Sequence, residues 1–84
     1  MKYYVVICLY RTGETSNDCE IVGIKYTYED AKQLFDETLP DVISNAKEWG
    51  MEYDEEEVHD NYFEAYGNEW HPSYYMKLYI QGVK

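Results

Sequence analysis

The stretch YYVVICLY at residues 3–10 decides how this 84-residue chain is organised. Its β-branched and aromatic side chains occupy both alternating sets of positions, which is typical of a central strand covered at least partly on both faces. A polar, turn-rich stretch at residues 12–18 follows, and residues 19–26 return to an apolar pattern. These features predict an N-terminal hairpin whose first strand lies in the middle of a sheet.

A helix is predicted after the hairpin, over residues 28–49. Thr27 and Asp30 form an N-capping pattern, apolar residues then recur at spacings of three and four, and Gly50 is placed to end the helix. Pro40 falls inside this helix and removes one backbone hydrogen bond. Because the apolar pattern keeps its phase across Pro40, we expect one kinked helix and not two.

Residues 54–66 fit two interpretations. Asp54 and Glu57 form a second acidic capping pattern, and several apolar residues after them share one helical face, which favours a helix. The tyrosines and Phe63 also allow a strand over residues 58–66. We expect the helix and keep the strand as the alternative.

The predicted fold class is α+β, in a single domain over residues 1–84. It consists of a small antiparallel sheet of three to four strands, with a kinked helix and a second helix packed on one face. The sheet contains the N-terminal hairpin and a C-terminal strand over residues 74–81, whose alternation turns Tyr74, Met76, Leu78 and Ile80 inward. We expect the first strand to lie between the second and the last.

Composition and charge exclude several classes of protein. Hydrophobic residues make up 45% of the chain and aromatic residues 18%, which is more than a disordered chain carries. The formal net charge is −10, because 17 acidic residues face only 7 basic ones. Direct binding to nucleic acid or to an anionic membrane needs the opposite sign. We therefore expect neither as a partner.

The two cysteines, Cys8 and Cys19, are too few for a secreted disulfide scaffold, and no export signal is visible at the start. We expect a cytoplasmic protein with reduced thiols. A hairpin folded about Gly13 and Glu14 would set Cys8 opposite Cys19. We expect both cysteines to be small buried apolar side chains.

No catalytic, cofactor or metal motif is visible. Glu56 and His59 are three residues apart, as in half of a di-iron site, but the chain has no second Glu-x-x-His to complete it. Cys8 lies in the most apolar stretch of an acidic protein, which disfavours an activated thiolate. The sequence therefore predicts a protein that is not an enzyme and that binds no cofactor and no metal.

The negative charge is concentrated in the middle of the chain. Residues 26–70 hold 14 acids and two bases, a net charge of −12, whereas the remaining residues carry a net charge of +2. In a helical 54–66 segment, Glu56, Asp60 and Glu64 would line up about 6 Å apart along the helix axis. The first helix would add a second acidic surface that contains Asp36, Glu37, Asp41 and Glu48.

These charges predict an acidic inhibitor or nucleic-acid mimic that occupies the basic groove of a nucleic-acid-binding protein, and the small anti-CRISPR proteins of phages are an analogy for this class. Trp70 would add an aromatic anchor. The alternative is a small structural or regulatory domain that self-associates, with acidity serving solubility only. Either hypothesis is compatible with a homodimer. The predicted protein interface is Asp36, Glu37, Asp41, Glu48, Asp54, Glu55, Glu56, Glu57, Asp60, Glu64, Glu69 and Trp70.

Overall fold

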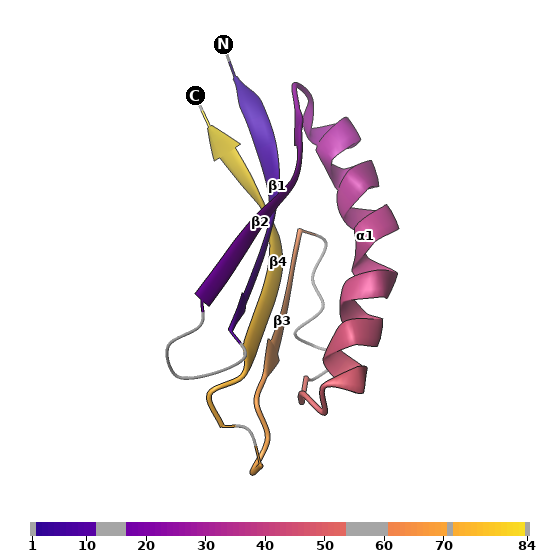
Figure 1. Cartoon of the computed structure of the whole chain (residues 1–84). Coiled ribbons are helices and arrows are strands. Elements are labelled where there is room, and N and C mark those ends of the chain that lie inside the picture. Colours follow the sequence, from indigo (N-terminus) through magenta and orange to yellow (C-terminus); the bar gives the residue numbers. More distant parts are fainter. Residues whose placement is uncertain (1, 12–16, 54–60, 71, 84) are drawn as a thin grey trace.

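The fold is a four-stranded antiparallel sheet with one described helix on one face (Figure 1). The computed structural model describes residues 2–11, 17–53, 61–70 and 72–83. The strand order is β2-β1-β4-β3, so the prediction that the first strand lies between the second and the last is confirmed. The elements in chain order are β1 (Tyr3–Arg11), β2 (Asn17–Lys25), α1 (Tyr28–Glu48), β3 (Tyr62–Tyr66) and β4 (Tyr75–Val83).

Helix α1 begins and ends where the sequence predicts. The Thr27 hydroxyl accepts a hydrogen bond from the backbone N–H of Asp30 at 3.2 Å. Gly50 follows the helix with a φ of 72°, a left-handed conformation that favours glycine. A single helix runs through Pro40, as the unbroken phase of its apolar residues indicates. No helix in the described part of the chain is long and apolar enough to cross a membrane.

The predicted second helix is wrong for the described part of residues 54–66. Residues 62–66 form strand β3, which pairs with β4, whereas residues 54–60 lie outside the described residues. Phe63 pairs with Leu78 and Ala65 with Met76, and all four side chains are buried. Every second residue of this segment therefore enters the core and packs against a residue of β4. The helix prediction used only a local capping pattern, which contains no information about these partners on another strand.

The core lies between α1 and one face of the sheet. Phe35 of α1, Val6 of β1, Phe63 of β3 and Leu78 of β4 are its largest fully buried side chains. The inward alternation predicted for the last strand is confirmed for Met76 and Leu78, which are buried, and Tyr74 and Ile80 pack against the same core. Helix and sheet therefore share one apolar layer.

The opposite face of the sheet, which we call the open face, has no described helix or strand over it (Figure 1). Strand alternation and the pairing register assign side chains to this face, because their sequence neighbours enter the core. On β1 and β2 the open face is mainly aliphatic and also carries Arg11 and Cys19, whereas on β3 and β4 it carries tyrosines, Glu64 and Lys77. An antiparallel sheet with one packed face and one uncovered face is the result.

The hairpin register differs from the predicted one by a single residue. Cys8 lies opposite Glu20, and Cys19 lies opposite Leu9. Because the side-chain period of a strand is two, this difference puts the two cysteines on opposite faces of the sheet. Cys8 is buried and Cys19 is exposed, and both thiols are free. The prediction of two buried cysteines is therefore confirmed for Cys8 and wrong for Cys19.

Candidate functional site

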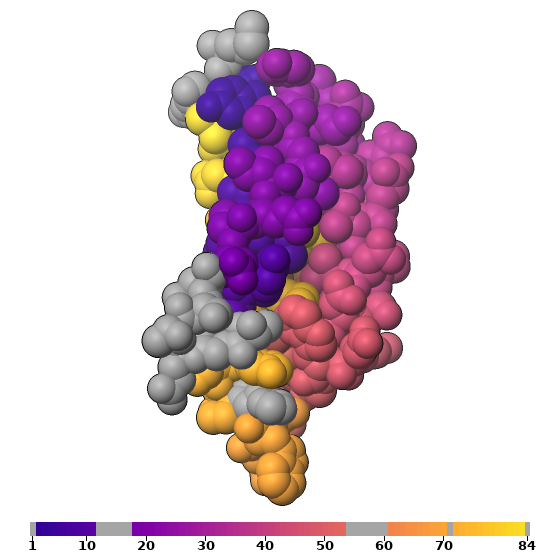
Figure 2. Space-filling view, viewed as in Figure 1, coloured from indigo at the N-terminus to yellow at the C-terminus, as the bar shows by residue number. Residues whose placement is uncertain are grey.

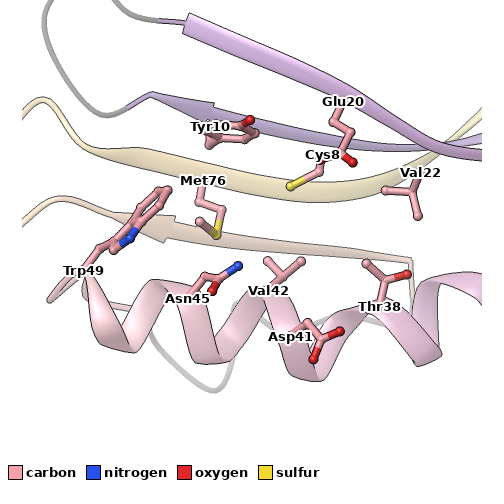
Figure 3. Close-up of a pocket in the computed structure, with 10 residues that line it drawn as sticks. All are labelled: Cys8, Tyr10, Glu20, Val22, Thr38, Asp41, Val42, Asn45, Trp49 and Met76. Carbon is pink, nitrogen blue, oxygen red and sulfur yellow. The ribbon is translucent and has the colours of Figure 1, made fainter.

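A groove of about 360 Å³ lies between helix α1 and the edge strand β2 (Figure 3). Its floor is apolar and its rims are polar. In Figure 2 the side chains of β2 and α1 meet along this side of the molecule. The residues that line the groove are Cys8, Tyr10, Glu20, Val22, Thr38, Asp41, Val42, Asn45, Trp49 and Met76.

The groove owes its shape to local irregularity in β2. The β1–β2 register shifts between Val6 and Ile7, so that Val22 is an extra residue on the β2 side of the pair. Gly23, next to it, has no side chain, and a Cβ placed there would lie 2.5 Å from Cδ2 of Leu34. Helix α1 therefore approaches β2 closely at Gly23, and the groove opens further along the strand.

Two carboxylates stand on opposite sides of the groove. Glu20 projects from β2 and Asp41 from α1, and both residues are exposed (Figure 3). Glu37 and Glu48 are spaced four residues before and seven residues after Asp41, which places them on the same side of the helix. The groove is thus bordered by negative charge from two elements that are distant in sequence.

Aromatic rings close one end of the groove. Tyr10 and Trp49 make an edge-to-face contact with 6.3 Å between ring centroids, and Trp49 makes a similar contact with Tyr74. The negative charge of Asp18, which pairs with Tyr10 across the hairpin, raises the pKa of the Tyr10 phenol. The same acidic border therefore extends to this end.

The Cys8 thiol at the floor of the groove is unsuited to nucleophilic chemistry. Burial raises its pKa to about 11, and the nearby Glu20 carboxylate adds to that effect. The thiol is protonated at neutral pH, and a protonated thiol is a poor nucleophile and a poor metal ligand. The groove can therefore bind a ligand but not attack one. It offers an apolar floor, two carboxylates and the Asn45 amide for that binding.

Metal ligands do not converge among the described residues: no group of three His, Cys, Asp or Glu side chains lies close enough to hold an ion. Glu56 and His59, the pair that resembles half of a di-iron site, lie outside the described residues.

The four predicted interface residues of α1 are all exposed, but they do not form one surface. Asp36 is an ion-pair partner of Lys32, one turn earlier on the helix. It is turned about 100° from Glu37, because an α-helix has 3.6 residues per turn. Glu37, Asp41 and Glu48 border the groove side, and Asp36 belongs to another side of α1.

The predicted carboxylate ladder of Glu56, Asp60 and Glu64 is wrong where the structure describes it, because Glu64 lies on strand β3 and not on a helix. Glu64 is half-buried on the open face, where it accepts hydrogen bonds from two tyrosines. Five other predicted interface residues, Asp54, Glu55, Glu56, Glu57 and Asp60, lie outside the described residues.

The remaining two predicted residues, Glu69 and Trp70, are exposed in the connection between β3 and β4. The Trp70 side chain is 83% exposed, and its backbone N–H donates to the Asn68 side chain at 2.9 Å. Neither residue lines the groove between α1 and β2. Both residues therefore lie outside the groove that Asp41 lines.

Comparisons with known proteins give no relative: no family model, no curated protein and no solved structure matches this chain. The site is therefore interpreted from its own chemistry.

Sequence reasoning missed Glu20, which is not among the predicted interface residues. The structure brings Glu20 to the same groove as Asp41. The available signal was the position of Glu20 on the second strand, which the predicted strand order puts at the edge of the sheet. Which face of that strand α1 covers depends on the register, and the predicted register was one residue off.

Proposed function

We propose that this protein is a non-enzymatic binding protein that engages a basic, nucleic-acid-binding protein through the groove between α1 and β2. Its carboxylates stand where phosphates of a nucleic acid would lie. The observation that carries this proposal is the pair of exposed carboxylates, Glu20 and Asp41, on opposite sides of an apolar floor.

The geometry suits a lysine or arginine side chain of the partner. Such a side chain has an apolar stem and a charged head. The stem would pack on Val22, Val42 and Met76, and the head would lie between the two carboxylates. Nucleic-acid-binding grooves are rich in these residues. A partner that holds this protein in such a groove has no room there for nucleic acid, so binding amounts to inhibition.

Long-range charge supports the same function. The net charge of −10 attracts a basic partner before contact, and this attraction weakens as salt rises. Most of the excess negative charge of the described residues lies on α1, which carries six acidic and two basic residues. Association should therefore be fast at low salt and slow at high salt.

Affinity capture tests the proposal with two matched double variants. Glu20→Lys with Asp41→Lys reverses the groove carboxylates, and Glu52→Lys with Glu69→Lys makes the same charge change at exposed positions outside the groove. Bait proteins are incubated with nuclease-treated lysate at 50 and 500 mM NaCl. Captured proteins are then eluted with duplex DNA or single-stranded RNA.

The proposal expects nucleic-acid-binding proteins that are captured at low salt and displaced by added nucleic acid. The groove variant should bind them at least tenfold more weakly than the control variant, mainly through slower association. Equal binding by the two variants, or a captured protein that nucleic acid does not displace, contradicts the proposal.

A further inference from the structure

The open face of the sheet carries a contiguous group of aliphatic side chains on its two neighbouring strands β1 and β2. We call this group the aliphatic patch, and it consists of Val5, Ile7, Leu9, Ile21 and Ile24. Val5 pairs with Ile24 and Ile7 with Ile21, so these side chains are cross-strand neighbours. The patch is one continuous surface and not scattered apolar residues.

The two isoleucines of β2 are the exposed part of this patch, whereas Ile7 and Leu9 are half-buried and Val5 is buried between its neighbours. Ile21 is 59% exposed and Ile24 is 52% exposed. Few large aliphatic side chains among the described residues are exposed to this extent. None of the five residues belongs to the cluster of core side chains between α1 and the sheet or packs against that cluster. A contiguous exposed apolar patch on a folded domain is typical of an interaction surface, whereas single exposed apolar residues are ordinary.

From this geometry we propose that the aliphatic patch is the interface of a homodimer, in which the open faces of two copies pack against each other. The partner is a second copy because this face is almost neutral in a strongly acidic protein. Its described charged residues are Arg11, Glu64 and Lys77. Face-to-face packing keeps the acidic helices of both copies on the outside, where their charges are farthest apart (Figure 1).

The size of the open face is sufficient for such a dimer. A nine-residue strand is about 30 Å long, and the outer axes of four strands are about 15 Å apart. If the open faces of two copies pack against each other, the two faces together bury on the order of 1,000 Å². That is the lower end of the range for specific interfaces. We therefore expect a dimer that dissociates in the micromolar range and not a permanent one.

Salt distinguishes this interface from the proposed groove interaction. Two copies that each carry a charge of −10 repel one another, and screening reduces this repulsion. Raising NaCl from 50 to 500 mM should strengthen the dimer, whereas the same change should weaken binding of a basic partner. The dimer does not depend on the proposed function, and either can fail alone.

Sedimentation equilibrium and light scattering on the full chain test the proposal, over 5–500 µM protein at both salt concentrations. Ile21→Lys and Ile24→Lys each introduce a charge at an exposed position of the patch, so folding should persist and circular dichroism checks it. Trp70→Lys is the matched control, because it removes a larger and more exposed side chain outside the patch.

The expected result is a concentration-dependent dimer whose dissociation constant rises at least tenfold in each isoleucine variant and changes less than twofold in the Trp70 control. A protein that stays monomeric at 500 µM and 500 mM NaCl overturns the proposal. A dimer that both isoleucine variants leave intact also overturns it, because the interface then lies elsewhere on the molecule.

Discussion

The phenolic oxygen of Tyr75 lies 2.7 Å from Oε2 of Glu64, so that the tyrosine on β4 donates a hydrogen bond to the carboxylate on β3. The two residues are diagonal neighbours on the open face, because Glu64 pairs with Lys77 and Tyr75 with Tyr66. Tyr66 donates to the same carboxylate oxygen at 3.3 Å. A short edge strand, β3, is thus attached to β4 by side chains as well as by its backbone.

Replacing Tyr75 with phenylalanine should lower the free energy of unfolding by about 1–2 kcal/mol, because it removes a hydrogen bond to a charged, half-buried acceptor. Urea denaturation measures this loss. Tyr79→Phe is the matched control: it removes a hydroxyl group from the same face of β4 without removing a bond to Glu64, so the loss should be smaller. Equal losses in the two variants would show that the hydrogen bond from Tyr75 to Glu64 does not stabilise the fold.

Alkaline pH should destabilise the protein from about pH 9 upward. Burial raises the pKa of Cys8 from 9.0 to about 11, and burial together with the hydrogen bond to Glu64 raises the pKa of Tyr75. The unfolded chain loses these protons at lower pH than the folded one. The free energy of unfolding is therefore highest below about pH 9 and decreases as the pH rises. For Cys8 the loss by pH 11 should reach about 2 kcal/mol.

Urea denaturation at pH 8, 9.5 and 11 measures this dependence. Cys8→Ala lacks the thiol, so its stability should decrease less between pH 8 and pH 11 than that of the wild type. Cys19→Ala is the control, because this exposed thiol has no comparable burial. Parallel curves for the wild type and Cys8→Ala would show that Cys8 makes no contribution.

Thiol labelling should distinguish the two cysteines. In the folded protein an aromatic disulfide reagent at pH 8 should modify one thiol quickly, because Cys19 is exposed and Cys8 is buried with a raised pKa. The second equivalent should react only after denaturation. Mass spectrometry of the early product should locate the label on Cys19, and two equally fast equivalents in folded protein would contradict the structure.

Gly23 and Gly82 should respond differently to substitution by alanine. At Gly23 a Cβ would lie 2.5 Å from the Leu34 side chain, whereas at Gly82 it would meet Tyr4 at 3.6 Å, an ordinary contact distance. Gly23→Ala should therefore cost about 1–2 kcal/mol as Leu34 and α1 move away from β2. Gly82→Ala should change stability by less than about 0.5 kcal/mol.

Thermal denaturation of the two alanine variants provides this measurement. A variant that also carries Leu34→Ala makes the cause explicit, since shortening Leu34 removes the atom that clashes with the new methyl group. The added cost of Gly23→Ala should then fall to less than half. An unchanged cost in the Leu34→Ala background would point to backbone conformation as the cause.

The sequence alone determined the elements whose signals are local. The apolar run at residues 3–10 predicted a central strand, and the Thr27 cap and Gly50 stop predicted both ends of α1, because capping depends on backbone groups a few residues away. The strand order on either side of β1 also followed from the hairpin and from the apolar character of that run. Fold class was predictable for the same reason.

Only the tertiary structure decided what depends on distant pairing. Residues 62–66 carry a tolerable helical pattern, and partners on β4 make them a strand. A register one residue from the predicted one placed Cys19 on the open face and Glu20 in the groove with Asp41. Because side chains alternate with a period of two, a shift of one residue exchanges the faces of a strand, and no local signal in the hairpin fixes that choice.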